Sequence, residues 1–195
     1  TAHGPDSFPR YVSWAPEGNA LLTCTAHGQP GQADKLQLWD SRSRRALQSW
    51  DVRPRQEPDV AWFLRGKVFA YASDKTQLFA AGTEKSVREL NQDANAVAWS
   101  PDGAVLAVRA RDSEKIELFA PQTGKRLRTI PTPRSHRRYG AMAFSPDGKT
   151  LACEIERNGI GLCDVERGLV TSRLEGQHEA PVHILRFTDS GNKLL

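Results

Sequence analysis

A short pattern of apolar and polar positions recurs along the chain. Each copy has an apolar residue, a small or polar residue and an aromatic residue, and a turn containing glycine follows. The aromatic residues of the five copies are Trp14, Trp62, Trp99, Phe144 and Phe187, which are separated by 48, 37, 45 and 43 residues. Alternation with period two sends both large side chains of a copy to the same face of an extended strand. The pattern therefore predicts β-strands whose aromatic residues pack in a core.

In two copies the turn has the sequence Ser-Pro-Asp-Gly, at residues 100–103 and 145–148. Proline fixes φ at the first corner, the aspartate side chain accepts hydrogen bonds within its own turn, and glycine adopts a positive φ. We therefore assign four residues to a structural repeat motif that reverses the chain, namely Asp102, Gly103, Asp147 and Gly148. An apolar stretch follows each turn and predicts a second strand, antiparallel to the first.

Two further strands complete each unit. The third strand is rich in apolar residues at 36–40, 76–80, 116–120 and 160–164, and a more polar fourth strand is clearest at 125–130 and 169–174. Four strands and a period of about 40 to 45 residues are typical of propeller blades. We therefore predict an all-β fold, a β-propeller of four-stranded antiparallel blades, with about four blades and the start of a fifth. Trp50 lies outside the pattern on an outer strand, where partial exposure and packing between blades are both open.

Several phrases of the sequence resemble the WD40 repeat family. They are Ser-Pro-Asp-Gly-Lys-Thr-Leu-Ala at 145–152, Leu-Trp-Asp at 38–40, Thr-Gly-Lys at 123–125 and Gly-Gln-His at 176–178. The resemblance adds Trp39, Asp40 and His178 to the structural repeat motif. It implies a propeller that works as an assembly platform, of a prokaryotic type that is often fused to signalling or enzyme domains. At the end of a third strand the Trp-Asp element occurs only at Trp39-Asp40, and the Gly-His element occurs only once, so we expect divergent blades held together mainly by apolar packing.

The repeat divides the chain into blades at 8–55, 56–92, 93–136 and 137–181, with residues 182–195 as the start of a fifth blade of the same propeller domain. The sequence stops inside the second strand of that fifth unit. Propellers usually close by joining their first and last blades, so that no sheet edge stays open. We therefore expect the chain to be part of a longer protein with a propeller of about six or seven blades.

Composition and cysteine usage set the broad class. The chain of 195 residues is 38% hydrophobic and 26% charged, with a formal net charge of +4, which is ordinary for a soluble globular protein. No stretch approaches the roughly 20 apolar residues that span a bilayer. The three cysteines, Cys24, Cys153 and Cys163, include no CxxC pair and suit buried free thiols in a reducing compartment. We expect a cytoplasmic protein.

No catalytic or metal-binding grouping stands out in the sequence. The five histidines, His3, His27, His136, His178 and His183, lie far apart and form no HxH or HExxH pattern. A metal site built from Cys153, Cys163 and His178 is an alternative to core packing of the two cysteines. We predict no enzymatic activity, no metal and no cofactor. The alternative is a hydrolase or lyase site at the mouth of the propeller channel, which needs carboxylates or histidines from several blades.

Two groups of arginines lie in the predicted links between blades. They are Arg53 and Arg55 after the first blade, and Arg134, Arg137 and Arg138 before the fourth. Because equivalent links emerge on one face of a propeller, these residues are expected to form a positive patch that binds a protein partner or another domain of the same chain. Nucleic-acid or anion binding is a second interpretation, and a solvated surface is a third. Interleaved acidic residues and missing aromatic residues argue against nucleic acid. The oligomeric state stays open.

Overall fold

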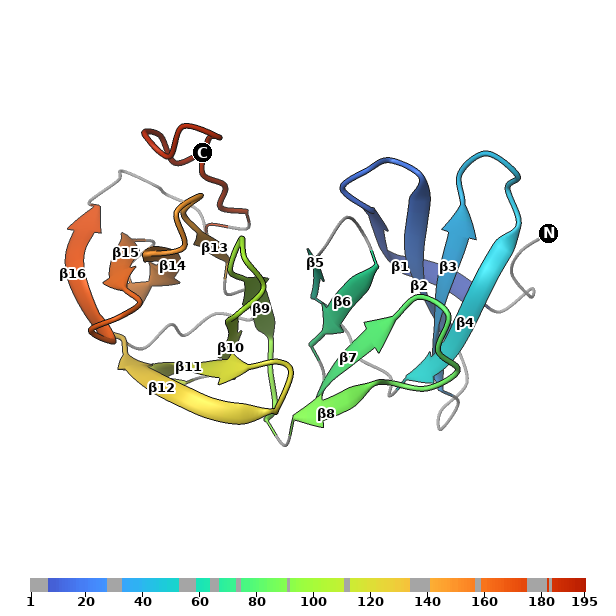
Figure 1. Cartoon of the computed structure of the whole chain (residues 1–195), viewed down its shortest axis with the longest axis horizontal. Coiled ribbons are helices and arrows are strands. Elements are labelled where there is room, and N and C mark those ends of the chain that lie inside the picture. Colours follow the sequence, from blue (N-terminus) through green and yellow to red (C-terminus); the bar gives the residue numbers. More distant parts are fainter. Residues whose placement is uncertain are drawn as a thin grey trace. The chain divides into compact units, whose positions relative to one another are not determined.

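The described part of the chain is built from β-strands that form four sheets (Figure 1). The computed structural model describes residues 7–27, 33–52, 59–63, 67–72, 75–90, 92–110, 113–133, 141–156, 159–174, 182 and 184–195. Every sheet has four strands in chain order, and every strand pairing with an assigned register is antiparallel. These sheets confirm the predicted all-β fold of four-stranded blades. Within these ranges, no helix has the length and apolarity needed to cross a membrane.

The first two blades lie in the N-terminal half of the chain. Blade 1 contains β1 (Ser7–Trp14), β2 (Ala20–His27), β3 (Asp34–Asp40) and β4 (Ala46–Val52). Blade 2 contains β5 (Val60–Phe63), β6 (Val68–Tyr71), β7 (Thr76–Ala80) and β8 (Arg88–Leu90).

The other two blades have the same strand order. Blade 3 contains β9 (Ala96–Trp99), β10 (Leu106–Arg109), β11 (Lys115–Ala120) and β12 (Lys125–Pro131). Blade 4 contains β13 (Met142–Phe144), β14 (Thr150–Ile155), β15 (Gly159–Asp164) and β16 (Leu169–Leu174). The blade limits inferred from the sequence stay predictions.

The turn between the first two strands has the same geometry in blades 1, 3 and 4 and at residues 188–193. In blade 3, Ser100 N–H donates to the Val105 carbonyl at 2.9 Å and Gly103 N–H donates to the Ser100 carbonyl at 2.9 Å. Gly18, Gly103, Gly148 and Gly191 occupy the same position, with φ between 68° and 72°. Glycine is required there because a side chain disfavours the left-handed region. The predicted chain reversal is confirmed.

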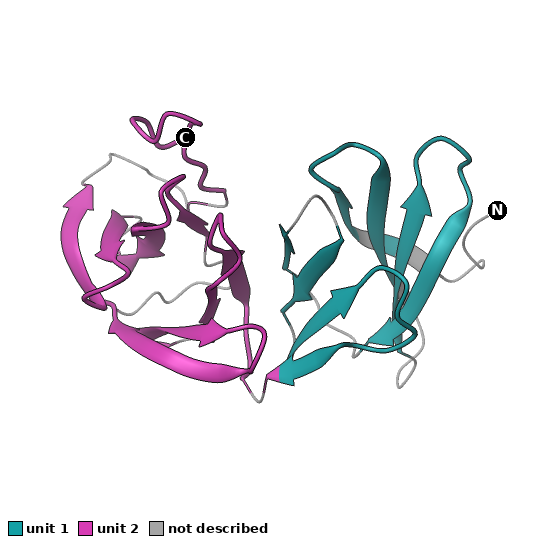
Figure 2. Ribbon diagram, in the orientation of Figure 1, with its two compact units in different colours: residues 1–89 teal, residues 90–195 magenta. Residues whose placement is uncertain are grey.

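The chain divides into two compact units, residues 1–89 and 90–195 (Figure 2). The core of the first unit lies between blades 1 and 2. Trp50 is buried there, and its ring lies 5.5 Å from that of Phe69 and 5.3 Å from that of Phe79, measured between ring centroids. Its indole N–H donates to the Thr83 carbonyl at 2.8 Å. Of the two alternatives for Trp50, the structure therefore shows packing between blades.

The core of the second unit lies between blades 3 and 4. The buried members are Ala98, Ala107, Ile116, Leu118 and Ile130 from blade 3, and Phe144, Leu151, Cys153, Ile155 and Cys163 from blade 4. A smaller cluster joins blade 4 to the C-terminal hairpin (residues 184–195), whose Leu185 packs with Ala152 and Ile160. Phe187 and Leu194 of this hairpin pair as an isolated bridge. Its turn repeats the geometry of the blade turns, so these residues are built like the first two strands of a blade.

The prediction that Trp14 packs in a core is wrong. Its side chain is 58% exposed, whereas Trp62, Phe144 and Phe187 at the same repeat position pack against apolar clusters. The position faces the preceding blade, as Trp62 shows by donating its indole N–H to Ser13 Oγ of blade 1 at 3.0 Å. Among the described residues no blade precedes β1, so nothing there covers Trp14.

Candidate interaction surface

The residues that the sequence assigned to partner binding lie outside the described residues. This holds for Arg53, Arg55, Arg134, Arg137 and Arg138, and also for the repeat-motif residue His178. Their role stays a prediction. The structure does describe what holds the chain immediately before one of these links, and what the recurring polar residues of the blades do.

A buried arginine holds the start of the link that carries Arg134. Arg109, at the end of β10, is 2% exposed and donates from Nη2 to the Pro133 carbonyl at 3.4 Å and to Thr132 Oγ1 at 3.5 Å. Its Nη1 donates to the main-chain carbonyl of Glu154 in blade 4. A buried guanidinium needs such acceptors because burial without them is costly. Arg109 therefore holds Thr132 and Pro133, which follow β12, against blade 4, directly before Arg134.

Sequence reasoning missed Arg109. A basic residue at the end of a strand resembles an ordinary surface residue, and a single sequence does not show what covers it. The one available signal is its position: it continues the apolar run of β10, all four residues of which are buried.

The two side chains of the Trp-Asp element in blade 1 form hydrogen bonds within that blade. Trp39 donates its indole N–H to Thr23 Oγ1 of the neighbouring strand at 2.9 Å. Asp40 Oδ1 accepts the main-chain N–H of Ser43 at 2.5 Å and that of Arg42 at 3.1 Å. These bonds, with that of Ser43 the largest cause, hold the pKa of Asp40 below its usual value. Both residues therefore stabilise the sheet and its β3–β4 turn.

The turn aspartates are bonded in the same way. Ser100 Oγ donates to Asp102 Oδ1 at 2.6 Å and accepts the Val105 N–H at 2.9 Å. The hydroxyl bond lowers the pKa of Asp102 below its usual value. The turn of blade 4 repeats this arrangement, since Ser145 Oγ donates to Asp147 Oδ1 at 2.6 Å and lowers the pKa of that carboxyl. A carboxylate held ionised by its own turn is unsuited to act as a general acid near neutral pH.

Glu117 is a buried carboxylate that the sequence analysis did not single out. Its side chain is 3% exposed, and Oε1 lies 2.8 Å from Arg126 Nη1 and 3.1 Å from Lys115 Nζ. The two cations lie on the same strand and on the neighbouring one, and both are largely exposed. The ion pair between Glu117 and Arg126 therefore joins β11 to β12, the outer strand of blade 3.

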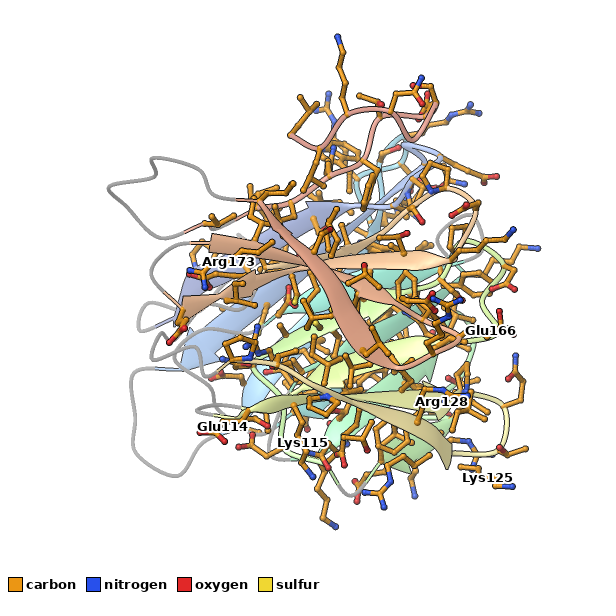
Figure 3. All side chains as sticks on the ribbon, turned by 90° about the vertical axis from the view of Figure 1, so that its left-hand side faces the viewer. Glu114, Lys115, Lys125, Arg128, Glu166 and Arg173 are labelled. Atoms are coloured by element: carbon orange, nitrogen blue, oxygen red, sulfur yellow. The ribbon has the colours of Figure 1, made fainter. Side chains whose placement is uncertain are left out.

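The outer strands of blades 3 and 4, β12 and β16, carry basic residues, and the acidic residues Glu114 and Glu166 lie in the adjoining turns (Figure 3). The labelled residues of this surface are Glu114, Lys115, Lys125, Arg128, Glu166 and Arg173. Arg173 donates to the Glu156 carbonyl at 3.0 Å, and the stem of Arg128 lies against the Gly168 turn. Interspersed charges are typical of a solvated surface rather than of a site for one kind of ion.

Two thiols meet in the core between blades 3 and 4. Cys153 Sγ and Cys163 Sγ are 3.8 Å apart, and both side chains are buried. The hydrogen bond between them lowers the pKa of Cys153 and raises that of Cys163. Within the described ranges, no three His, Cys, Asp or Glu side chains are placed to hold a metal ion. The arrangement is core packing of two thiols.

Comparisons with known proteins add to this geometry. No family model matches the chain. The chain is 30% identical over 108 residues to the WD repeat-containing protein VIP3 of Arabidopsis thaliana, a match that covers 50% of this chain and 33% of the relative. A solved structure of the Kuenenia stuttgartiensis hydrazine synthase superposes with a TM-score of 0.74 and 20% sequence identity. This match covers 95% of the present chain and 54% of the other. The chain thus spans about a third of the curated relative and about half of the structural one.

Proposed function

We propose that this chain, a divergent WD40-like β-propeller, is a non-catalytic scaffold that binds another protein or another domain of its own polypeptide. The observation that carries the proposal is that the recurring polar residues form hydrogen bonds within their own blades. Trp39, Asp40, Asp102 and Asp147 are all bonded within their own blades. The repeat therefore builds a rigid support, and partner binding is left to the links and loops that the support presents.

We propose that the link arginines Arg53, Arg55, Arg134, Arg137 and Arg138 bind an acidic or phosphorylated segment of the partner. Guanidinium groups bind carboxylates and phosphates with two parallel hydrogen bonds, which gives both strength and orientation. Arg109 supports this role, because its bond to the Pro133 carbonyl fixes the chain one residue before Arg134. A link held at its base presents its side chains at lower cost in conformational entropy.

An enzymatic role is the second candidate, because the structural relative is named as an enzyme. At 20% identity that likeness concerns the fold, and a fold hosts many functions. The turn aspartates do not supply the catalytic acid that such a role needs. A catalytic acid needs a raised pKa, whereas those of Asp40, Asp102 and Asp147 are lowered by turn hydrogen bonds.

We place the protein in a reducing compartment such as the cytoplasm. The supporting observation is that Cys24, Cys153 and Cys163 are buried free thiols. Thiols of this kind are typical of proteins kept reduced. Nucleic acid remains the less favoured partner, because the charged outer surface of blades 3 and 4 carries both signs.

The test is affinity capture with charge-reversed variants. One bait carries Arg53→Glu and Arg55→Glu, and a second carries Arg134→Glu, Arg137→Glu and Arg138→Glu. The control bait carries Lys125→Glu and Lys149→Glu, which make the same charge change as the first bait at exposed positions in blades 3 and 4. We expect the wild-type and control baits to capture a common partner that both link variants lose. If the link variants retain every partner, the assignment of the arginines is wrong.

A further inference from the structure

The β3–β4 turn of blade 1 carries three arginines within four residues. Arg42, Arg44 and Arg45 are all exposed. Within the described ranges of the chain, none of the three forms an ion pair. The matching turn of blade 4 differs, because its arginine, Arg167, pairs with Asp164 at 3.8 Å. The turn of blade 1 therefore presents three guanidinium groups whose charges are not used in ion pairs between described residues.

Arg44 adopts the backbone conformation that glycine has in two other blades. Its φ is 59°, and it is the only non-glycine residue with a positive φ in the part of the chain that the structure describes. Its N–H donates to the Asp40 carbonyl at 3.0 Å, just as Gly124 and Gly168 donate to the carbonyl four residues before them at 2.8 and 2.9 Å. A Cβ atom disfavours this left-handed region, so glycine fits the position with less strain. A strained residue at such a position indicates a function for its side chain.

Hydrogen bonds fix this turn without using the three guanidinium groups. The Asp40 carboxylate accepts two main-chain N–H groups of the turn. Ser41 donates its N–H to the Asn19 carbonyl at 3.1 Å and its hydroxyl to the Gly18 carbonyl at 3.1 Å, which ties the turn to the β1–β2 turn at the same end of blade 1 (Figure 1). Three guanidinium groups and one carboxylate give residues 40–45 a charge of +2. A site fixed before binding loses less conformational entropy when a ligand arrives.

We propose that the β3–β4 turn of blade 1 binds a phosphorylated segment of a polypeptide, with the phosphate held by Arg42, Arg44 and Arg45. A phosphate monoester carries a charge of about −2 near neutral pH, which matches the charge of the turn. Its three oxygens accept the paired N–H groups of guanidinium in bidentate geometry, which a lysine cannot provide.

Other anionic partners fit the turn less well. Residues 40–46 contain no aromatic side chain on which a nucleic-acid base could stack. They also contain no large apolar side chain that could insert into a membrane. The turn precedes β4, whereas Arg53 and Arg55 follow that strand, so this site is distinct from the link arginines. The proposal goes beyond the scaffold function and does not rest on it.

The test is fluorescence anisotropy with a fluorescein-labelled peptide, Gly-Asp-Ser-Asp-Gly, in which the serine is phosphorylated. The parent protein is the whole chain with the link arginines neutralised, so that binding by the links does not contribute and each proposal can fail separately. Its substitutions are Arg53→Gln, Arg55→Gln, Arg134→Gln, Arg137→Gln and Arg138→Gln. We expect saturable binding that weakens as salt rises, with a dissociation constant at least about tenfold lower than that for the unphosphorylated peptide.

Neutralising the turn should remove this binding. Adding Arg42→Gln, Arg44→Gln and Arg45→Gln to the parent should raise the dissociation constant at least about tenfold. The matched control loses the same three charges at exposed positions elsewhere and should bind as the parent does. Its substitutions are Lys125→Gln, Lys149→Gln and Lys193→Gln. Far-UV circular dichroism checks that each variant is folded, as expected for exposed positions.

The strain at Arg44 gives a second readout. Arg44→Gly should raise the thermal midpoint of the first unit by about 2–4 °C, because glycine adopts the positive φ without strain. The same substitution should weaken binding of the phosphorylated peptide at least about threefold, because one guanidinium group is lost. Arg44→Lys keeps the Cβ atom and the charge and should leave the midpoint unchanged.

Several outcomes would overturn the proposal. They include no saturable binding at low salt, and equal affinities of the parent and the turn variant. Equal binding of the unphosphorylated peptide would mean unspecific attraction of acidic groups, and competition by inorganic phosphate at the concentration of the peptide would mean a site for the free ion. Tighter binding of a single-stranded oligonucleotide, or of vesicles containing anionic lipid, would identify another class of ligand. A lower midpoint for Arg44→Gly would show that the arginine is not strained.

Discussion

Trp50 is the position where the packing between blades 1 and 2 is most open to test. Replacing it with alanine removes an indole that contacts the rings of both Phe69 and Phe79 and donates to the Thr83 carbonyl. The matched control is Trp14→Ala, the same chemical change at an exposed position of the same blade. If the core of the first unit lies where the structure places it, only the first substitution is severe.

The magnitude follows from the lost contacts. Removing a buried Trp or Phe side chain costs about 3–5 kcal/mol, because the apolar burial is lost and a cavity remains. That range already contains two aromatic contacts of about 0.5–1.5 kcal/mol each and a hydrogen bond of about 1 kcal/mol. We therefore expect Trp50→Ala to lower the free energy of unfolding by about 4 kcal/mol and Trp14→Ala by less than about 1 kcal/mol.

The assay is urea unfolding followed by circular dichroism and intrinsic fluorescence, at a concentration where the chain is monomeric. With an m-value of about 2 kcal/mol per M, Trp50→Ala should lower the midpoint of the first unit by about 2 M and Trp14→Ala by less than about 0.5 M. Equal shifts for the two variants would refute the assignment of Trp50 to the interface between blades. So would a loss below about 1 kcal/mol for Trp50→Ala.

Three further predictions concern other elements. The pKa values of Asp102 and Asp147 are lowered from 3.8 in the folded state, so the stability they contribute is present above that value and is lost as the pH falls through the folded pKa. The thermal midpoint of a double variant, Asp102→Asn with Asp147→Asn, should therefore fall less steeply below pH 4 than that of the wild type. Equal slopes would contradict this. Gly168→Ala should lower the free energy of unfolding in urea titrations more than Gly18→Ala does, because both glycines have positive φ but only the new methyl at 168 lies 2.4 Å from Arg128 Cδ. Adding Arg128→Ala should remove this difference. Equal losses for the two glycine variants would contradict the contact between Arg128 and the Gly168 turn. Arg109→Met should lower the free energy of unfolding by at least about 2 kcal/mol, because it leaves buried carbonyls without a donor, and calorimetry showing a smaller loss would mean that the guanidinium is dispensable.

The architecture could be read from the sequence because the blades repeat. The period of the aromatic residues and the Ser-Pro-Asp-Gly turns are local signals, and Ser100, Asp102 and Gly103 form the bonds that the turn chemistry predicts. The sequence could not show which segment covers a given face of a strand. Period two shows that Val12 and Trp14 share a face, but which segment covers that face depends on the neighbouring blade. The same reason left two alternatives for Trp50.

The burial of polar side chains could not be predicted from the sequence either. Arg109 and Glu117 lie at strand positions that alternation alone does not distinguish from solvated ones, and their burial follows from the carbonyls and cations that the fold brings to them. Both side chains form contacts across strands or blades, and such contacts leave no periodic trace. The link arginines follow from charge clustering alone, so their role as a site stays a prediction.

The most direct test of the scaffold account is the affinity of the purified chain for the segment that affinity capture identifies. Calorimetric titration compares the wild type, the Arg134→Glu, Arg137→Glu, Arg138→Glu variant and the Lys125→Glu, Lys149→Glu control over a series of salt concentrations. The account predicts binding by the wild type and the control that weakens as salt rises, and a dissociation constant at least about tenfold higher for the link variant. Equal affinities for all three proteins, or turnover of the bound segment by the wild type, would contradict it.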